Sequence, residues 1–441
     1  MAQAVPSPAP RACGRPRADL AVPEVLGVNL AINRFDAWVL KEPWARSDFE
    51  SWARNIRLGW EWDENAFGTN MFSHPFHGSL YFNAGRSNCL TYWESVPLAF
   101  LGSWTWEFFG ETFRPSLNDF FMTTFGGIAL GEITHRVAAT IRDTEARGAG
   151  RIVREIGATL INPLSGLNRL IHGDWTRVGS NPAEHRPGAF EFALKAGVRR
   201  LYGDSTDVVN VGPTLMVDIG YGDPFERPYD APFDVFTLHA QVSPRGGGLN
   251  ALQGRGRLFQ LELPFWGDRV RHAFVVTHRY DYIHNPAYSF GLQSVEAGIV
   301  SRFPLIKAFR LRTRLAADLG ALGAIDAPFG GVGERSYDFG PGAGAILELV
   351  LERHGRTYVT FLNRGEYLHS VSGAPANHLI AFSALEGNIP LARGFGLGFH
   401  LGGDARISRY ADGTENKREF FETRLFVSWT SVRQADGPGT P

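Results

Sequence analysis

The sequence predicts an α+β protein in which an N-terminal helical domain precedes an antiparallel transmembrane β-barrel of about 12 strands. The hydrophobic period is the main reason, because it is helical before residue 175 and becomes two after residue 188. Composition agrees: 13% aromatic residues and 51 glycines stand beside only 20% charged residues. That mixture is typical of a β-rich protein with much apolar surface.

Charge and hydropathy argue against a nucleic-acid-binding protein and against a protein with conventional transmembrane helices. The 44 basic and 45 acidic residues leave a net charge of −1, so no basic surface is expected for nucleic acid. No run of about 18 uncharged apolar residues occurs, which argues against a conventional transmembrane helix. No signal peptide is visible at the start, which resembles a mature or truncated N-terminus.

The same patterns divide the chain into five segments. Pro- and Ala-rich composition predicts a disordered leader, and the stretch GSNPAEHRPG has the composition of a linker. The expected segments are a leader (1–26), a helical domain (27–175), a linker (176–187), a barrel (188–432) and a disordered tail (433–441).

The second half alternates between apolar and polar residues. In FRLRTRLAADLGA, Phe309, Leu311 and Leu315 alternate with Arg310 and Arg314. This pattern is typical of a strand with one apolar and one polar face. The stretch HAFVVTHRYDYIH is less regular. About twelve such segments occur, near 188–202, 209–222, 232–243, 250–266, 270–284, 288–301, 307–321, 336–352, 356–369, 377–389, 394–409 and 417–431.

Strands of this length favour a membrane barrel. Soluble strands average about five to six residues, whereas a tilted membrane-spanning strand needs about nine to eleven. The polar partners are then expected to face the lumen and to pair with each other, and they are Lys195, Glu262, Arg310, Arg312, Arg314, Glu348, Asp404, Arg406, Glu422 and Arg424. A large soluble β-sandwich with a polar outer face is the alternative.

Polar residues in the helical half form the candidate site. Glu107 and Glu111 stand four residues apart and share one helix face, while Asp119 belongs to the next helix. A chemical interpretation makes His74 a general acid or base that these carboxylates orient. The candidate catalytic residues are therefore His74, Glu107, Glu111 and Asp119.

A structural interpretation explains such residues without chemistry. Carboxylates on aromatic helices near a membrane must be paired or hydrogen-bonded, because an unpaired one costs several kcal/mol. The expected polar network consists of Asn70, Tyr81, Arg86, Ser116, Glu132 and Arg136. His74 and His77 have no third ligand at a diagnostic spacing, so neither a metal nor a cofactor is expected.

Three segments of the helical half resemble the family catalogued as domain of unknown function 3943. They are WEWDENAFGTNMFSHPFHGSLYFNAGRS, SWTWEFFGETFRPSLNDFFMTTFGGIALGE and NPLSGLNRL, and the resemblance covers about residues 55 to 172. It implies an uncharacterised bacterial envelope protein with a β-rich C-terminal half, and it implies no reaction. The order of His, Tyr, Glu and Ser-x-x-Asp also faintly resembles the VanZ-like proteins, which carry membrane helices.

These observations lead to two functional expectations. The first is an outer-membrane protein whose helices plug or brace the periplasmic side, with a structural role or with passage of a small or lipidic solute. About 120 helical residues exceed the lumen of twelve strands, so we expect the helices at the rim, with aromatic faces near outer-membrane lipid. The alternative is a lipid-modifying membrane enzyme, a hydrolase or acyltransferase that uses His74.

Overall fold

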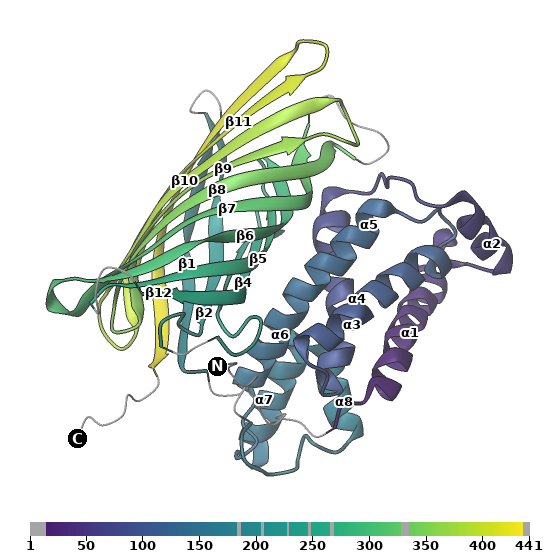
Figure 1. Ribbon diagram of the computed structural model, residues 1–441, viewed down its shortest axis with the longest axis horizontal. Helices are drawn as coiled ribbons and strands as arrows, with labels where there is room; N and C mark the ends of the chain where they lie inside the picture. Colours follow the sequence, from purple (N-terminus) through teal and green to yellow (C-terminus); the bar gives the residue numbers. More distant parts are fainter. Residues whose placement is uncertain are drawn as a thin grey trace, which may run out of the picture.

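The computed structural model describes residues 15–182, 187–203, 207–226, 229–245, 248–264, 269–327 and 335–434. Within these ranges, a domain of packed helices comes first and a closed antiparallel barrel follows (Figure 1). The expected fold class is therefore confirmed.

The helical domain contains regular α-helices joined by short 3₁₀ or π segments. The α-helices are α1 (Ala18–Phe35), α2 (Phe49–Leu58), α3 (His74–Ser87), α4 (Tyr92–Thr105), α5 (Leu117–Phe121), α6 (Gly127–Ile141), α7 (Gly148–Ile161) and α8 (Pro163–Ile171). The short segments are η1 (Asp36–Leu40), η2 (Pro43–Ala45), η3 (Thr69–Ser73), η4 (Trp106–Gly110) and η5 (Met122–Gly126).

The helical domain begins earlier than the sequence indicates. The composition places residues 1–26 in a disordered leader, but α1 begins at Ala18. Ala21 and Val25 are buried four residues apart on one face of this helix. Tertiary packing of that face stabilises a helix that the local composition does not reveal. Residues 1–14 lie outside the described residues.

The barrel is built from twelve described strands. They are β1 (Ala189–Tyr202), β2 (Val208–Tyr221), β3 (Phe236–Ser243), β4 (Gly248–Leu263), β5 (Arg271–His284), β6 (Ser289–Pro304), β7 (Phe309–Asp326), β8 (Tyr337–Arg353), β9 (Arg356–His369), β10 (Ala376–Pro390), β11 (Phe395–Tyr410) and β12 (Glu415–Gln434). Consecutive strands pair antiparallel, and β1 pairs with β12 to close the barrel. Each of the twelve expected segments coincides with one of these strands.

Side chains alternate between the two faces of the barrel wall. Leu194, Leu315 and Leu425 are among many exposed apolar residues that point outward. Their strand neighbours Lys195 and Arg314 point the other way and form ion pairs with residues of the adjacent strands. An apolar outside and a polar inside are characteristic of a barrel that crosses a membrane.

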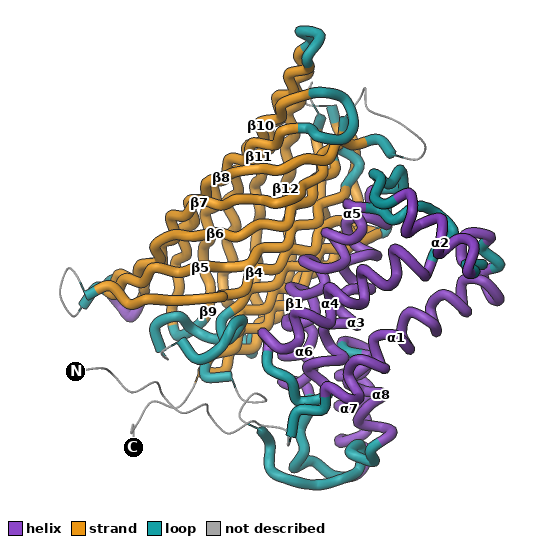
Figure 2. The backbone as a smooth tube through the Cα atoms, turned by 45° about the vertical axis from the view of Figure 1, so that its right-hand side comes forward, coloured by secondary structure: helices purple, strands orange, loops and turns teal. Residues whose placement is uncertain are grey.

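The helical domain packs against the outer face of the barrel wall, as Figures 1 and 2 show. Ile219, Tyr280 and Leu322 belong to one outward-facing row that crosses the sheet from β2 to β7. These residues share a hydrophobic core with Phe82 of α3 and Ile133 of α6. The helices thus cover a stripe of the wall that would otherwise belong to the apolar outer face.

This position differs from the expected one at the periplasmic rim. A Cβ atom on Gly254 of β4 would lie 2.7 Å from Cδ1 of Ile133, so the side chain of Ile133 on α6 packs directly onto the wall at this glycine. Tyr280 extends the contact by donating its hydroxyl to the Met71 carbonyl at 2.7 Å. Alternation along the strands cannot distinguish such a helix-covered surface from a lipid-facing one.

None of the helices in the described ranges combines the length and hydropathy needed to cross a bilayer.

Candidate functional site

Four polar side chains of the helical domain meet in a cluster that we call the acid cluster: His74, Glu107, Glu111 and Asp119. Nε2 of His74 lies 3.5 Å from Oδ2 of Asp119. His74 directly follows η3, Glu107 lies within η4, and Asp119 shortly precedes η5. Single π-helical turns are uncommon in proteins, but those that occur are often found at functional sites. Their presence around these residues therefore marks the acid cluster as a candidate site.

Hydrogen bonds from nearby groups hold the carboxylates of the acid cluster. The backbone N–H of Ser116 donates to Oε2 of Glu107 at 2.8 Å, and the indole N–H of Trp106 donates to Oε1 of Glu111 at 2.8 Å. Ser116 is also the N-cap of α5, because its hydroxyl accepts from the backbone N–H of Asp119 at 3.3 Å. One serine thus orients two of the carboxylates.

Burial controls protonation within the acid cluster. Burial and the nearby Asp119 raise the pKa of Glu107, and burial with the nearby Asp63 raises the pKa of Asp119. Burial also raises the pKa of Glu111 to about 7, although the adjacent His74 opposes the rise. The pKa of His74 is itself lowered by burial. The cluster is therefore mostly uncharged at neutral pH.

A second buried group in the helical domain carries full charges. Glu132 of α6 is completely buried, and it accepts from Nε of Arg86 and Nε of Arg136, both at 2.8 Å. Arg136 also donates to the carbonyl of Pro232 at 2.9 Å, in the segment that joins β2 to β3. We call Arg86, Glu132 and Arg136 the charged triad. It connects α3 and α6 to the barrel.

The two remaining network candidates lie apart from both groups. Nδ2 of Asn70 donates to the hydroxyl of Tyr337 on β8 at 2.6 Å, which adds a further contact between helices and barrel. The hydroxyl of Tyr81 donates to the Asn29 side chain of α1 and lies 2.8 Å from Nε2 of His77. The expected polar residues thus form separate groups rather than one continuous network.

The acid cluster is packed shut on the sides that the structure describes. His74 is 9% exposed, Glu107 3% and Asp119 4%, and none of them lines either of the two cavities in the barrel. Among the described residues, no three His, Cys, Asp or Glu side chains are arranged to hold a metal ion. This geometry suits proton sharing between buried side chains better than contact with a substrate.

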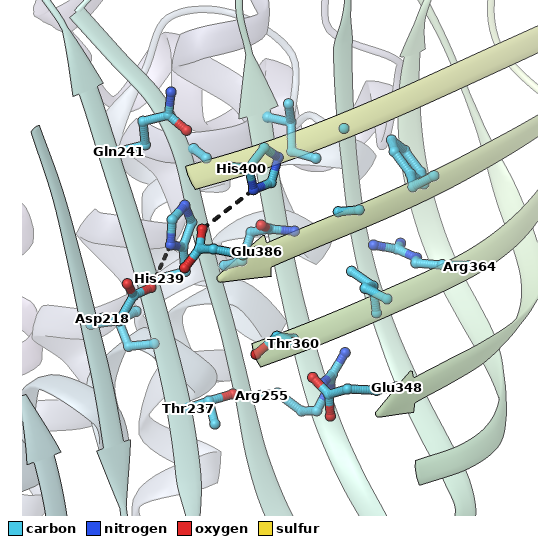
Figure 3. A pocket seen from close by; sticks show the side chains of 18 of the residues that line it. Asp218, Thr237, His239, Gln241, Arg255, Glu348, Thr360, Arg364, Glu386 and His400 are labelled. Carbon is cyan, nitrogen blue, oxygen red and sulfur yellow. Dashed lines mark hydrogen bonds and ion pairs between the residues drawn. The ribbon is translucent and has the colours of Figure 1, made fainter. Parts of the chain in front are cut away.

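A cavity of about 400 Å³ lies inside the barrel. Side chains from both walls line it, and Figure 3 shows Asp218 and His239 pointing toward each other, as do Glu386 and His400. Oδ1 of Asp218 lies 2.6 Å from Nδ1 of His239. The lumen therefore holds a sizeable cavity whose lining combines charged and apolar side chains.

Ion pairs in the lumen join neighbouring strands and also strands three or four positions apart in the wall. Lys195 of β1 pairs with Asp218 of β2 at 2.6 Å and with Glu386 of β10. Arg279 of β5 pairs with Glu366 of β9 at 2.5 Å. Such pairs narrow the passage and neutralise the charges that they bring together.

Sequence reasoning missed several of these lumen residues. Asp218, His239 and Glu386 were not singled out, although they share the polar face of strands that the alternation identifies. Arg279 lies in the irregular stretch HAFVVTHRYDYIH, where alternation is hidden. The irregularity arises because Ala273 and Val275, which share the face of Arg279 in the strand alternation, are apolar and pack with Phe225 and Val300.

Comparison with known families supports the resemblance found in the helical domain. Residues 59–164 match the model of the family described as Domain of unknown function (DUF3943). The match includes every residue of the acid cluster and of the charged triad, and it agrees with the expected range. The faint likeness to VanZ-like proteins has no support in this match.

Solved structures that match the barrel are very distant. The toluene transporter TodX of Pseudomonas putida is 9% identical, with 56% of this chain and 90% of that chain covered and a TM-score of 0.21. The outer membrane protein opdK of Pseudomonas aeruginosa is 9% identical, with 55% and 99% covered and a TM-score of 0.20. No curated protein matches significantly. At such scores the matches say nothing about function, and the barrel rests on its own strand pairing.

Proposed function

We propose that this protein is an outer-membrane barrel that admits a small polar solute into its lumen, while the helical domain braces the wall from outside. The observation that carries the proposal is the cavity of about 400 Å³ within a closed ring of twelve described strands, lined by charged and amide side chains. A polar cavity inside an apolar barrel is suited to holding a water-soluble molecule within a membrane.

A bracing role is supported by where the helices make contact. Their core residues Phe82 and Ile133 pack with the outward-facing Tyr280 and Leu322, so among the described residues this hydrophobic contact leaves the lumen free. The charged triad adds a polar attachment through Pro232. Together these contacts favour a brace over a plug.

Lipid is the proposed neighbour of the remaining outer surface. Apolar side chains are exposed on the strands, as at Leu319, and on the helices, as at Trp38 and Trp104. The helices lie beside the wall (Figure 2), and we propose that both sets of side chains contribute to one lipid-facing surface. Tryptophan is enriched where proteins meet the membrane interface, which fits contact of the helical domain with lipid headgroups and upper acyl chains.

Proteoliposome swelling tests the proposed passage of solute. Ala384 of β10 lines the cavity, and Ala381 of the same strand is exposed on the outer face. We expect liposomes that contain the full chain to swell in small amino acids, Ala384→Trp to slow swelling several-fold, and Ala381→Trp to leave the rate unchanged. Equal rates for the two variants, or no swelling with the unmodified protein, would overturn the proposal.

A further inference from the structure

Arg199 differs from the other arginines that line the lumen cavity. The arginines are Arg199, Arg255, Arg279, Arg312, Arg364 and Arg424. Within the described part of the chain, every one of them except Arg199 has a carboxylate within 4.0 Å. Arg199 is 1% exposed, and a buried cation without a counter-charge is costly.

Within the described residues, Arg199 makes two side-chain hydrogen bonds, and both go to neutral groups. Nη1 donates to Oδ1 of Asn250 at 3.2 Å and Nη2 donates to Oδ1 of Asn210 at 3.4 Å. Nε is buried and has no partner among the described residues. Nε2 of Gln241, which lines the same cavity, is likewise buried without a partner there. Two unused N–H donors, one of them cationic, thus lie in the wall of one cavity.

Asp404 is the counterpart of Arg199 on the acidic side. Of the carboxylates that line the cavity, Asp218, Asp281, Glu348, Glu386 and Glu422 each have a cation within 4.0 Å. Glu191 has none, but both of its oxygens accept from Thr357 at 3.0 Å. Asp404 accepts only from the hydroxyl of Tyr288, at 2.6 Å, among the described residues.

The placement of the two unpaired charges restricts the solute. Arg199 on β1 lies directly opposite Arg424 on β12, and Asp404 lies on the next strand, β11. Asp404 also lies four residues along β11 from His400, the residue level with Arg424. Two strand spacings and four residue rises separate the two backbones by roughly 17 Å, so the ion pair that each lacks among the described residues is not formed between them. A free anion would leave Asp404 unpaired, and a free cation would leave Arg199 unpaired. A molecule that carries both charges satisfies both residues.

We infer that the lumen binds a small zwitterion, an amino acid whose ammonium and carboxylate are separated by a short chain. Its carboxylate accepts from Nε of Arg199 and from Nε2 of Gln241, and its ammonium donates to Asp404. This inference rests on the proposed function, since it specifies the solute that the barrel admits. The remaining cavity charges are already paired within the protein, so they hold the walls in place and exclude solutes with a large net charge.

Calorimetric titration of the full chain in detergent micelles tests the inference with three probes of equal chain length: 4-aminobutyrate, butanoate and butylammonium. We expect 4-aminobutyrate to bind at least tenfold more tightly than either singly charged probe. Arg199→Gln should weaken 4-aminobutyrate and butanoate at least tenfold. Asp404→Asn should weaken 4-aminobutyrate and butylammonium and leave butanoate unchanged. Gln241→Leu, which removes no charge, should weaken only the two carboxylate probes.

The matched control is Arg409→Gln, which removes one positive charge at an exposed position of β11 where Arg409 pairs with Glu415. It should leave all three affinities unchanged, and thermal melting of each variant verifies folding. The inference fails if butanoate binds as tightly as 4-aminobutyrate, or if Arg199→Gln binds every probe normally. The swelling assay separates the inference from the proposed function. If solute passes at the same rate in Arg199→Gln as in the unmodified protein, only the inference is overturned. If 4-aminobutyrate binds tightly but does not pass, only the proposed function is overturned.

Discussion

The lumen of the barrel and the acid cluster both bury carboxylates, but they stabilise them in opposite ways. In the lumen, Arg279 is surrounded by Asp281 at 2.8 Å, Asp318 at 3.1 Å and Glu366 at 2.5 Å. In the acid cluster, Glu107 and Asp119 face each other without a lysine or arginine among their recorded partners in the described ranges. Around Arg279 the lumen carboxylates are stabilised by ion pairs, whereas burial favours the neutral form of the carboxyl groups in the acid cluster.

This difference follows from the groups that surround the carboxylates in each region. Lumen carboxylates are held across a polar cavity by arginines, which stay charged under all ordinary conditions. The acid cluster lies between aromatic helices, where burial favours the neutral form of each carboxyl group. Substitutions that remove a charge should therefore be severe in the lumen and in the charged triad, and mild in the acid cluster.

The largest effect is expected for Arg279→Met. The substitution leaves Asp318 without the cation that it contacts in the described ranges, whereas Asp281 and Glu366 keep their ion pairs with Arg364. Loss of one partner of a buried ion pair costs roughly 3–5 kcal/mol, and we expect a value in this range. Urea unfolding in micelles, followed by tryptophan fluorescence, measures the change. A loss below about 1 kcal/mol would contradict the assignment of these residues to a dry, paired interior.

A smaller effect should separate the charged triad from the acid cluster. Glu132→Gln removes the only carboxylate that Arg86 and Arg136 contact in the described ranges, so the free energy of unfolding should fall by about 3 kcal/mol. Glu107→Gln makes the same chemical change where the carboxyl group is already protonated at neutral pH. The amide oxygen still accepts from the Ser116 N–H, and the loss should stay within about 1 kcal/mol.

The pair of variants is its own control, because both replace a buried glutamate of the helical domain by its amide. Equal losses of stability in the two variants would show that Glu107 is charged. A small loss of stability in Glu132→Gln would show that the charged triad does not carry its charges. Thermal melting at pH 7 distinguishes these outcomes.

The barrel could be predicted further from sequence than the acid cluster. Alternation in stretches such as FRLRTRLAADLGA fixes which residues face outward, since one period applies along the whole strand. It fails in β5, where Ala273 and Val275 place apolar side chains on the face of Arg279 and pack with Phe225 from the segment that joins β2 to β3. Helical spacing places Glu107 and Glu111 on one face, but the π turns and the break at Pro115 decide that both meet Asp119. The approach of both glutamates to Asp119 depends on tertiary packing, which the spacing of residues in the sequence does not determine.

The smallest expected effect is a dependence of stability on pH that originates in Glu111. The pKa of Glu111 is about 7 in the folded chain and near 4.5 when it is unfolded, so the folded state binds the additional proton between these values. Its contribution is therefore complete below about pH 4.5 and is lost as the pH rises through 7, by on the order of 1–2 kcal/mol after allowance for partial exposure.

His74 acts in the opposite direction, because its lowered pKa makes the folded state bind fewer protons below pH 6.5. The comparison that isolates Glu111 is therefore the difference in unfolding free energy between the unmodified protein and Glu111→Gln, measured at intervals from pH 5 to pH 8. We expect the advantage of the unmodified protein to shrink from pH 5 to about pH 7 and to level off above the pKa of Glu111. A difference that stays constant, or grows as the pH rises, would mean that Glu111 is ionised throughout and that the acid cluster handles charge as the lumen does.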